Sequence, residues 1–270
     1  MTTSTHELTT ELKRLDQDRL RGHRGGSIAM HRALVHFRLG PMNLLVASVL
    51  FVFFSALWLM ILPYVCAVWQ LLLARGLQAL HLDARLELVV WQSGFVKIAV
   101  PCLRMTPLLP EFRTWFWNCL ITVGALASTY FLPKHLVPII YLSRAILLIH
   151  ATGCVYFAIW PAQFPHTPDS YLQGLMLSSI AIITIVPLIF ALTYYIFDFG
   201  LWRKAFLTAL TMAYLTLFIP IQVLFQAVFL RKTVLYMPLL YIVFAMPADV
   251  LIIVALYAWG MTWRFRESQQ

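Results

Sequence analysis

The feature that most constrains this chain is an apolar run from Pro41 to Ala74 that contains no formally charged residue. A helix crosses roughly 30 Å of hydrocarbon with about 20 apolar residues, because each residue adds about 1.5 Å. The run is therefore longer than one perpendicular span but too short for two spans and a turn. We predict one long first membrane helix within residues 41–80, kinked at Pro63.

The rest of the chain has the same membrane-like composition. Of its 270 residues, 61% are hydrophobic and only 11% are charged, whereas a soluble domain carries about a quarter charged residues. Further apolar runs cover residues 114–132, 136–160, 170–197, 202–230 and 235–262. We predict an all-α polytopic membrane protein with about six transmembrane helices, the last five forming a bundle over residues 114–263.

Residues 81–113, between the first and second spans, have a different pattern. Two short runs alternate apolar with other residues, and the turn-forming Gln92-Ser93-Gly94 separates them. The alternating apolar positions are Leu86, Leu88 and Val90, followed by Val96, Ile98 and Val100. We predict a short extracytoplasmic β-hairpin here. Because an isolated two-stranded hairpin is marginal in water, we expect it to lean on a partner protein or on a second copy.

The basic residues indicate the orientation in the membrane. With the N-terminus inside, the inner side carries Lys13, Arg14, Arg19, Arg21, Arg24, Arg32, Arg38, Lys134, Arg203, Lys204, Arg264 and Arg266. The outer side carries Arg85, Lys97, Arg104, Arg113, Arg231 and Lys232. This excess predicts that both termini are cytoplasmic. A bacterial inner membrane is the expected location, since no organelle-targeting or cleavable signal segment is apparent.

Two polar segments flank the spans. Residues 1–40 are predicted to be a basic cytoplasmic segment, and Ser4 and Glu7 have the spacing of a capping box at the start of a short amphipathic helix over residues 4–21. That helix is either a docking element or a solvated tail. Residues 264–270 are predicted to be a cytoplasmic tail.

Chemical motifs are absent from the sequence. The cysteines Cys66, Cys102, Cys119 and Cys154 stand singly, without the spacing of a metal or redox motif. There is no zinc-protease, nucleophile-elbow, P-loop or dinucleotide-binding signature. The net charge of +9 is spread among segment ends rather than gathered into one stripe, so it favours membrane lipids over nucleic acid as a partner. We expect no catalytic residue, no metal and no cofactor.

Ionisable and amide side chains inside the spans are the candidates for a functional site. Arg144, His150 and Asp249 each need a partner or a watery pocket in lipid, and counting along their helices allows all three to meet near the midplane. Such a cluster is either a proton relay or ligand site, or a buried ion pair that fixes helix register. Gln222 and Gln226 are one helical turn apart and are expected to join helices.

An external segment holds two more candidates. His166 lies between Pro165 and Pro168, and Asp169 directly follows Pro168. A third proline, Pro161, precedes them. The prolines are typical of a stiff turn between spans. The alternative is that His166 or Asp169 acts as an acid or base on a lipid-linked substrate at the outer face.

The last span carries a weak resemblance. Met237-Pro238-Leu239 and Tyr257-Ala258-Trp259 lie within the segment from Arg231 to Trp263. That segment resembles the terminal membrane segment of processive polysaccharide synthases. The carboxylate clusters and the substrate-gripping Gln/Arg-Trp motif of those synthases are absent, so the resemblance does not extend to the glycosyl-transfer centre.

Three hypotheses for function follow. The first is a non-catalytic integral subunit of an inner-membrane assembly for envelope polysaccharide synthesis or export, with a protein partner or as a homo-oligomer. The second is a small transporter or channel that uses Arg144, His150 and Asp249. The third is a membrane enzyme acting on a lipid-linked substrate.

Overall fold

The computed structural model describes residues 41–93, 96–133, 136–196 and 200–262. The predicted helix over residues 4–21, the tail over residues 264–270 and the tip of the hairpin lie outside the described residues. The elements are α3 (Pro41–Ala79), β1 (Arg85–Ser93), β2 (Val96–Arg104), α4 (Phe112–Ser128), α5 (Val137–Ile159), η2 (Pro161–Gln163), α6 (Pro168–Ile196), α7 (Leu201–Leu230), η3 (Val234–Tyr236), α8 (Met237–Phe244) and α9 (Met246–Thr262).

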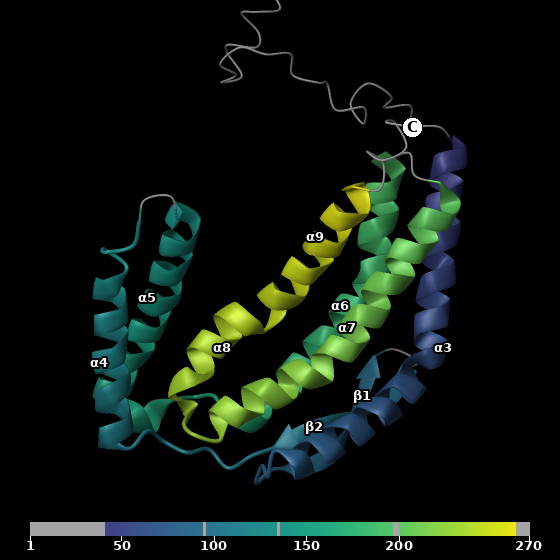
Figure 1. The fold of residues 1–270 in the computed structure, drawn as a ribbon. Helices are drawn as coiled ribbons and strands as arrows, with labels where there is room; N and C mark the ends of the chain where they lie inside the picture. Colours follow the sequence, from purple (N-terminus) through teal and green to yellow (C-terminus); the bar gives the residue numbers. More distant parts are fainter. Residues whose placement is uncertain (1–40, 94–95, 134–135, 197–199, 263–270) are drawn as a thin grey trace, which may run out of the picture.

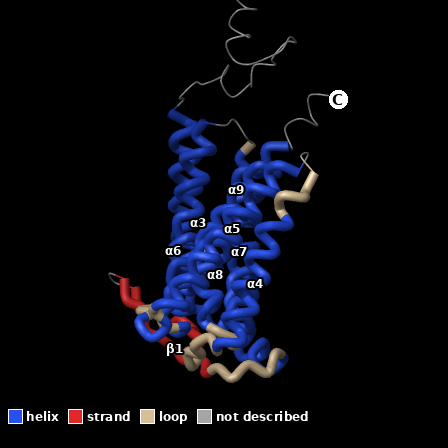
Figure 2. Tube along the Cα trace, turned by 90° about the vertical axis from the view of Figure 1, so that its left-hand side faces the viewer, coloured by secondary structure: helices blue, strands red, loops and turns tan. Residues whose placement is uncertain are grey.

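The prediction of a helical membrane protein is confirmed in its coarse form. Five segments are long and apolar enough to cross a membrane: α3, α5, α6, α7 and the final stretch Val234–Gly260, which contains α8 and α9. The 17-residue helix α4 is not among them. Figure 1 shows that α3 begins and α9 ends at the same end of the bundle, and Figure 2 shows the strands at the opposite end.

Helix α3 is one continuous helix despite Pro63 inside it. Figure 1 shows it changing direction along its length, so that its C-terminal part runs beneath the hairpin. Its buried side chains recur every three or four residues and form one stripe, which packs on α6 and α7. Two buried indoles on this stripe are hydrogen-bonded: Trp58 Nε1 donates to Thr184 Oγ1 at 3.0 Å, and Trp69 Nε1 donates to the Thr216 carbonyl at 2.8 Å.

The predicted hairpin is present. Strands β1 and β2 pair antiparallel, with Arg85 opposite Arg104 at one end and Ser93 opposite Val96 at the other. The expectation of a partner assumed an isolated hairpin, but this hairpin is not isolated, because β2 packs on α3 and α6 of the same chain and buries Val100 and Leu103 completely. The hairpin therefore obtains its apolar support from the bundle.

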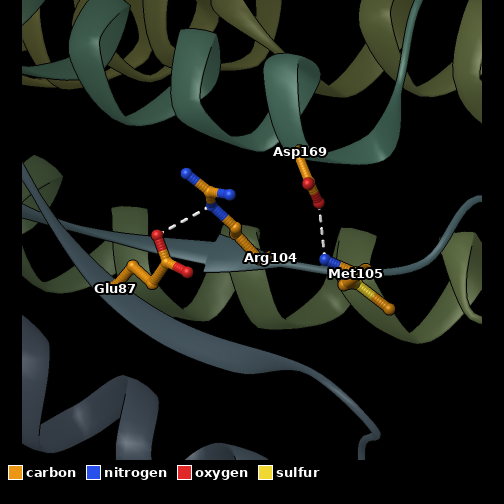
Figure 3. A network of polar contacts seen from close by, with 4 residues as sticks. All are labelled: Glu87, Arg104, Met105 and Asp169. Atoms are coloured by element: carbon orange, nitrogen blue, oxygen red, sulfur yellow. Dashed lines mark hydrogen bonds and ion pairs between the residues drawn. The ribbon is translucent and has the colours of Figure 1, made fainter.

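One hydrogen bond ties the hairpin to the start of α6. Asp169 Oδ1 accepts from the backbone N–H of Met105 at 2.5 Å, just after β2 ends (Figure 3). The neighbouring ion pair between Arg104 and Glu87, at 2.8 Å, has side chains that are 58% and 43% exposed, so water screens it. Figure 3 also shows Asp169 descending from α6 towards the strand.

We predict that Asp169→Ala loosens the hairpin. The change leaves a backbone N–H without its carboxylate acceptor, which costs on the order of 1–3 kcal/mol. Cys102, close to this bond, is buried, and burial raises the pKa of its thiol to about 11, so it reacts slowly with maleimide in the folded protein. Labelling of Cys102, located by peptide mass spectrometry, should accelerate in Asp169→Ala and not in the control Glu87→Ala. Equal rates in both variants would contradict this role.

Candidate functional site

The last span is interrupted at Ala245. Helix α8 ends at Phe244 and α9 begins at Met246, while Ala245 between them has φ −82° and ψ −127°, outside the helical region. Pro247 in the first turn of α9 has no N–H to continue the helical ladder. The break therefore leaves backbone carbonyls in the middle of a membrane segment that need other donors.

Two glutamines on α7 supply those donors. Gln222 Nε2 donates to the Phe244 carbonyl and lies 3.3 Å from the Ala245 carbonyl, and Gln226 Nε2 donates to the Phe244 carbonyl at 3.0 Å. Tyr171 of α6 donates its hydroxyl to Gln226 Oε1. Both amides are buried. The glutamines thus join α7 to the broken span, as predicted for interhelical amides. They do so by capping the carbonyls of Phe244 and Ala245 at the break.

Asp249 lies one helical turn beyond the break and is fully buried. Among the described residues, neither of its carboxylate oxygens has a hydrogen-bond partner. The Ser179 hydroxyl on α6 faces the carboxyl, but the two groups do not meet hydrogen-bond geometry. Gln222 Oε1 is also buried without a partner. A charged carboxylate in this position is expensive, so it marks a candidate functional site.

Asp249 and Ser179 lie at nearly the same depth, and Gln222 lies about one helical turn nearer the hairpin end. At about 1.5 Å per residue, Asp249 is roughly 18 Å from the start of α8, Ser179 roughly 17 Å from the start of α6, and Gln222 roughly 12 Å from the end of α7. All three of those helix ends lie at the hairpin end of the bundle (Figure 1). The site is therefore in the interior of the bundle, far from both ends of the last span.

The predicted cluster of Arg144, His150 and Asp249 is not formed. Arg144 Nε donates to Thr129 Oγ1 at 2.9 Å, and its guanidinium lies 4.2 Å from the centre of the Tyr130 ring. The reason is topological: α5, which carries Arg144, packs on α4, η3 and α8, whereas α9, which carries Asp249, packs on α6, α7 and α8. The Arg144 side chain therefore binds at the C-terminal end of α4.

His150 has a separate environment. Its ring stacks on Tyr236 of η3, with centroids 5.6 Å apart and planes 8° apart. Its buried Nδ1 has no hydrogen-bond partner among the described residues. Tyr236 in turn donates to Asn118 Oδ1 on α4 at 2.8 Å. His150 therefore belongs to the junction of α4, α5 and η3.

His166 and Asp169 do not form a dyad. Within the described residues, no hydrogen bond or ion pair joins the two side chains, and the Asp169 carboxylate binds the Met105 N–H instead. His166 is exposed, and the edge of its ring meets Phe164 at a centroid distance of 5.8 Å. Both lie around the proline-rich turn, as expected of a structural connection.

In the described part of the chain, no group of three or more His, Cys, Asp or Glu is placed to hold a metal ion.

Comparison of the chain with protein-family models, with curated proteins and with solved structures finds no match.

The sequence contained a signal for the break that the apolar pattern hides. The same dipeptide begins both half-helices, Met237-Pro238 in α8 and Met246-Pro247 in α9. Proline is favoured in the first turn of a helix, where its missing N–H has no partner to lose. Ser179 gave no comparable signal, because a serine in an apolar helix is ordinary until its neighbours are known.

We predict that Gln226→Leu destabilises the bundle. The variant removes one donor from the Phe244 carbonyl and leaves the buried Tyr171 hydroxyl without its acceptor, which should lower the free energy of unfolding by about 1–3 kcal/mol. Denaturation of the purified protein in detergent measures the change. Gln70→Leu is the matched control, since Gln70 is an exposed glutamine on α3. A stability loss no greater in Gln226→Leu than in Gln70→Leu would rule out the capping role.

Proposed function

We propose that the chain is a non-catalytic integral subunit of an inner-membrane assembly that makes or exports an envelope polysaccharide. In this proposal α4 is a sixth span and both termini are cytoplasmic. An even number of crossings agrees with the ends of the described chain lying together in Figure 1. The excess of basic residues in the segments at that end supports the orientation.

The observation that carries the proposal is the loose attachment of α4 and α5. Helix α4 buries only Thr122, and the α4–α5 pair meets the rest of the protein mainly through η3 and α8. Its small apolar core, built on Cys154, Phe157, Val234 and Leu235, is separate from the main core. Figure 1 shows the pair standing apart from α9 towards the end where the described chain begins and ends.

The loose attachment of α4 and α5 supports the hypothesis that a helix of a partner protein packs beside them. Lipid is as apolar as a helix surface, so spans stay together through close packing and polar contacts rather than through the hydrophobic effect. The α4–α5 pair meets the rest of the chain mainly through η3 and α8, and the contacts include the hydrogen bond that the Tyr236 hydroxyl of η3 donates to Asn118 Oδ1 of α4, at 2.8 Å. A transmembrane helix of a partner, placed between this pair and α9, would supply the packing that the chain lacks there.

The polysaccharide part of the proposal rests on the last span. Its resemblance to the terminal segment of processive synthases is confined to Arg231 through Trp263, and the chain has none of their catalytic motifs. A chain of this kind fits beside a synthase or an exporter as a subunit that performs no glycosyl transfer itself.

The test is purification of the tagged protein from its native host, without overexpression, in mild detergent. We predict that a glycosyltransferase or secretion component co-purifies in fixed stoichiometry. A photo-crosslinking residue replacing Leu142, exposed on α5, should capture the same protein, and one replacing Met60, exposed on α3, should capture it less. Isolation as a monomer or homo-oligomer, with crosslinks to lipid at both positions, would contradict the proposal.

A second candidate function, a small transporter, is favoured by the broken last span. Discontinuous helices with free carbonyls near the midplane are typical of transporter binding sites. In this version Asp249 is central, and Arg144 and His150 lie elsewhere. Transport that fails in Asp249→Asn while the purified variant stays folded would favour the transporter over the subunit.

A further inference from the structure

Four buried oxygen atoms around the break have no hydrogen-bond partner in the part of the chain that the structure describes. They are the two carboxylate oxygens of Asp249, Oγ of Ser179 and Oε1 of Gln222. The exposed fractions of these residues are 0%, 0% and 4%. Most buried polar atoms in proteins are paired, so a group of four on three neighbouring helices indicates something that the protein atoms alone do not supply.

The chemistry of this set favours a hard cation. A carboxylate, a hydroxyl and an amide carbonyl are all oxygen ligands, which Na⁺ and other hard cations prefer over nitrogen or sulfur. The nearby carbonyls of Phe244 and Ala245 each accept from two N–H groups already. The candidate ligands are therefore the three side chains.

We propose that Asp249, Ser179 and Gln222 bind a monovalent metal cation, Na⁺, between α6, α7 and α9. The carboxylate supplies the single negative charge, so one Na⁺ makes the site neutral. A divalent ion would leave a net positive charge in the interior of the bundle, at a large desolvation cost.

No basic side chain of the packed elements is positioned to neutralise Asp249 instead. The elements packed against α9 are α6, α7 and α8. Of their described residues, α8 has no charged side chain, α6 has only Asp169 near its start, and α7 has Arg203 and Lys204 near its start. The start of α7 lies at the far end of α9, since Leu207 meets Gly260 there. Gly260 is roughly 16 Å along α9 from Asp249.

The site goes beyond the proposed subunit role and does not depend on it, because the binding residues all come from one chain. Na⁺ binding by a protein that purifies alone would uphold the site and refute the subunit. A stable partner protein, with no effect of Na⁺ on Tm, would uphold the subunit role and refute the Na⁺ site.

The experiment is thermal unfolding of the purified full chain in nanodiscs at pH 8, followed by tryptophan fluorescence. NaCl is titrated against choline chloride at constant ionic strength. Ligand binding to the folded state raises Tm by mass action, and Na⁺ at about ten times its Kd should give a rise of roughly 3 °C, which continues to grow with the logarithm of the Na⁺ concentration. Asp249→Asn should lose this rise. The control Asp83→Asn, which alters an exposed carboxylate between α3 and β1, should keep it.

Ser179→Ala keeps the test decisive if Asp249→Asn fails to fold. This variant should need a severalfold higher Na⁺ concentration for the same rise in Tm, and its Tm in choline should stay near that of the parent. The proposal is overturned if Na⁺ gives no rise beyond that of choline in the parent, which would mean that Asp249 binds only a proton. It is also overturned if the Na⁺ response of Ser179→Ala, or of a folded Asp249→Asn, equals that of the parent.

Discussion

The constraint on which this structure depends is the satisfaction of backbone carbonyls at the interruption of the last span. In lipid, an unpaired carbonyl costs several kcal/mol because no water can replace its lost helical donor. Gln222 and Gln226 meet this requirement from α7, and Tyr171 of α6 holds Gln226 in place. The capped break is thus joined to α6 and α7, the same two helices on which α3 packs.

The same arrangement explains why a carboxyl group can lie in the interior. The break lets α9 start anew at mid-span, which places Asp249 in the first turn of a helix, where backbone N–H groups favour negative charge. That favourable field is weak compared with the cost of burying an anion, and no described basic side chain compensates for it. A bound cation is the remaining source of neutralisation for an ionised carboxylate.

Much of the fold was predictable because its signals are local. Long apolar runs located the helices to within a few residues, and alternation located β1 and β2. Two features could not be predicted from the apolar pattern and helix depth alone. The apolar run continues through Ala245, so periodicity cannot reveal the break between α8 and α9. Depth counting placed Arg144 level with Asp249, but depth along a helix does not determine which helices are neighbours, and α5 pairs with α4. Ser179 became a candidate only once α6 and α9 were seen together.

The central claim is that the last span consists of two half-helices joined by a non-helical residue whose neighbouring carbonyls are capped by α7. Electron cryo-microscopy of the full chain in nanodiscs, at side-chain resolution, tests this most directly. We expect a break in the helical density between Phe244 and Met246, with the Gln222 and Gln226 side chains extending to it. A single unbroken helix from Met237 to Thr262, with both glutamines directed elsewhere, would contradict it.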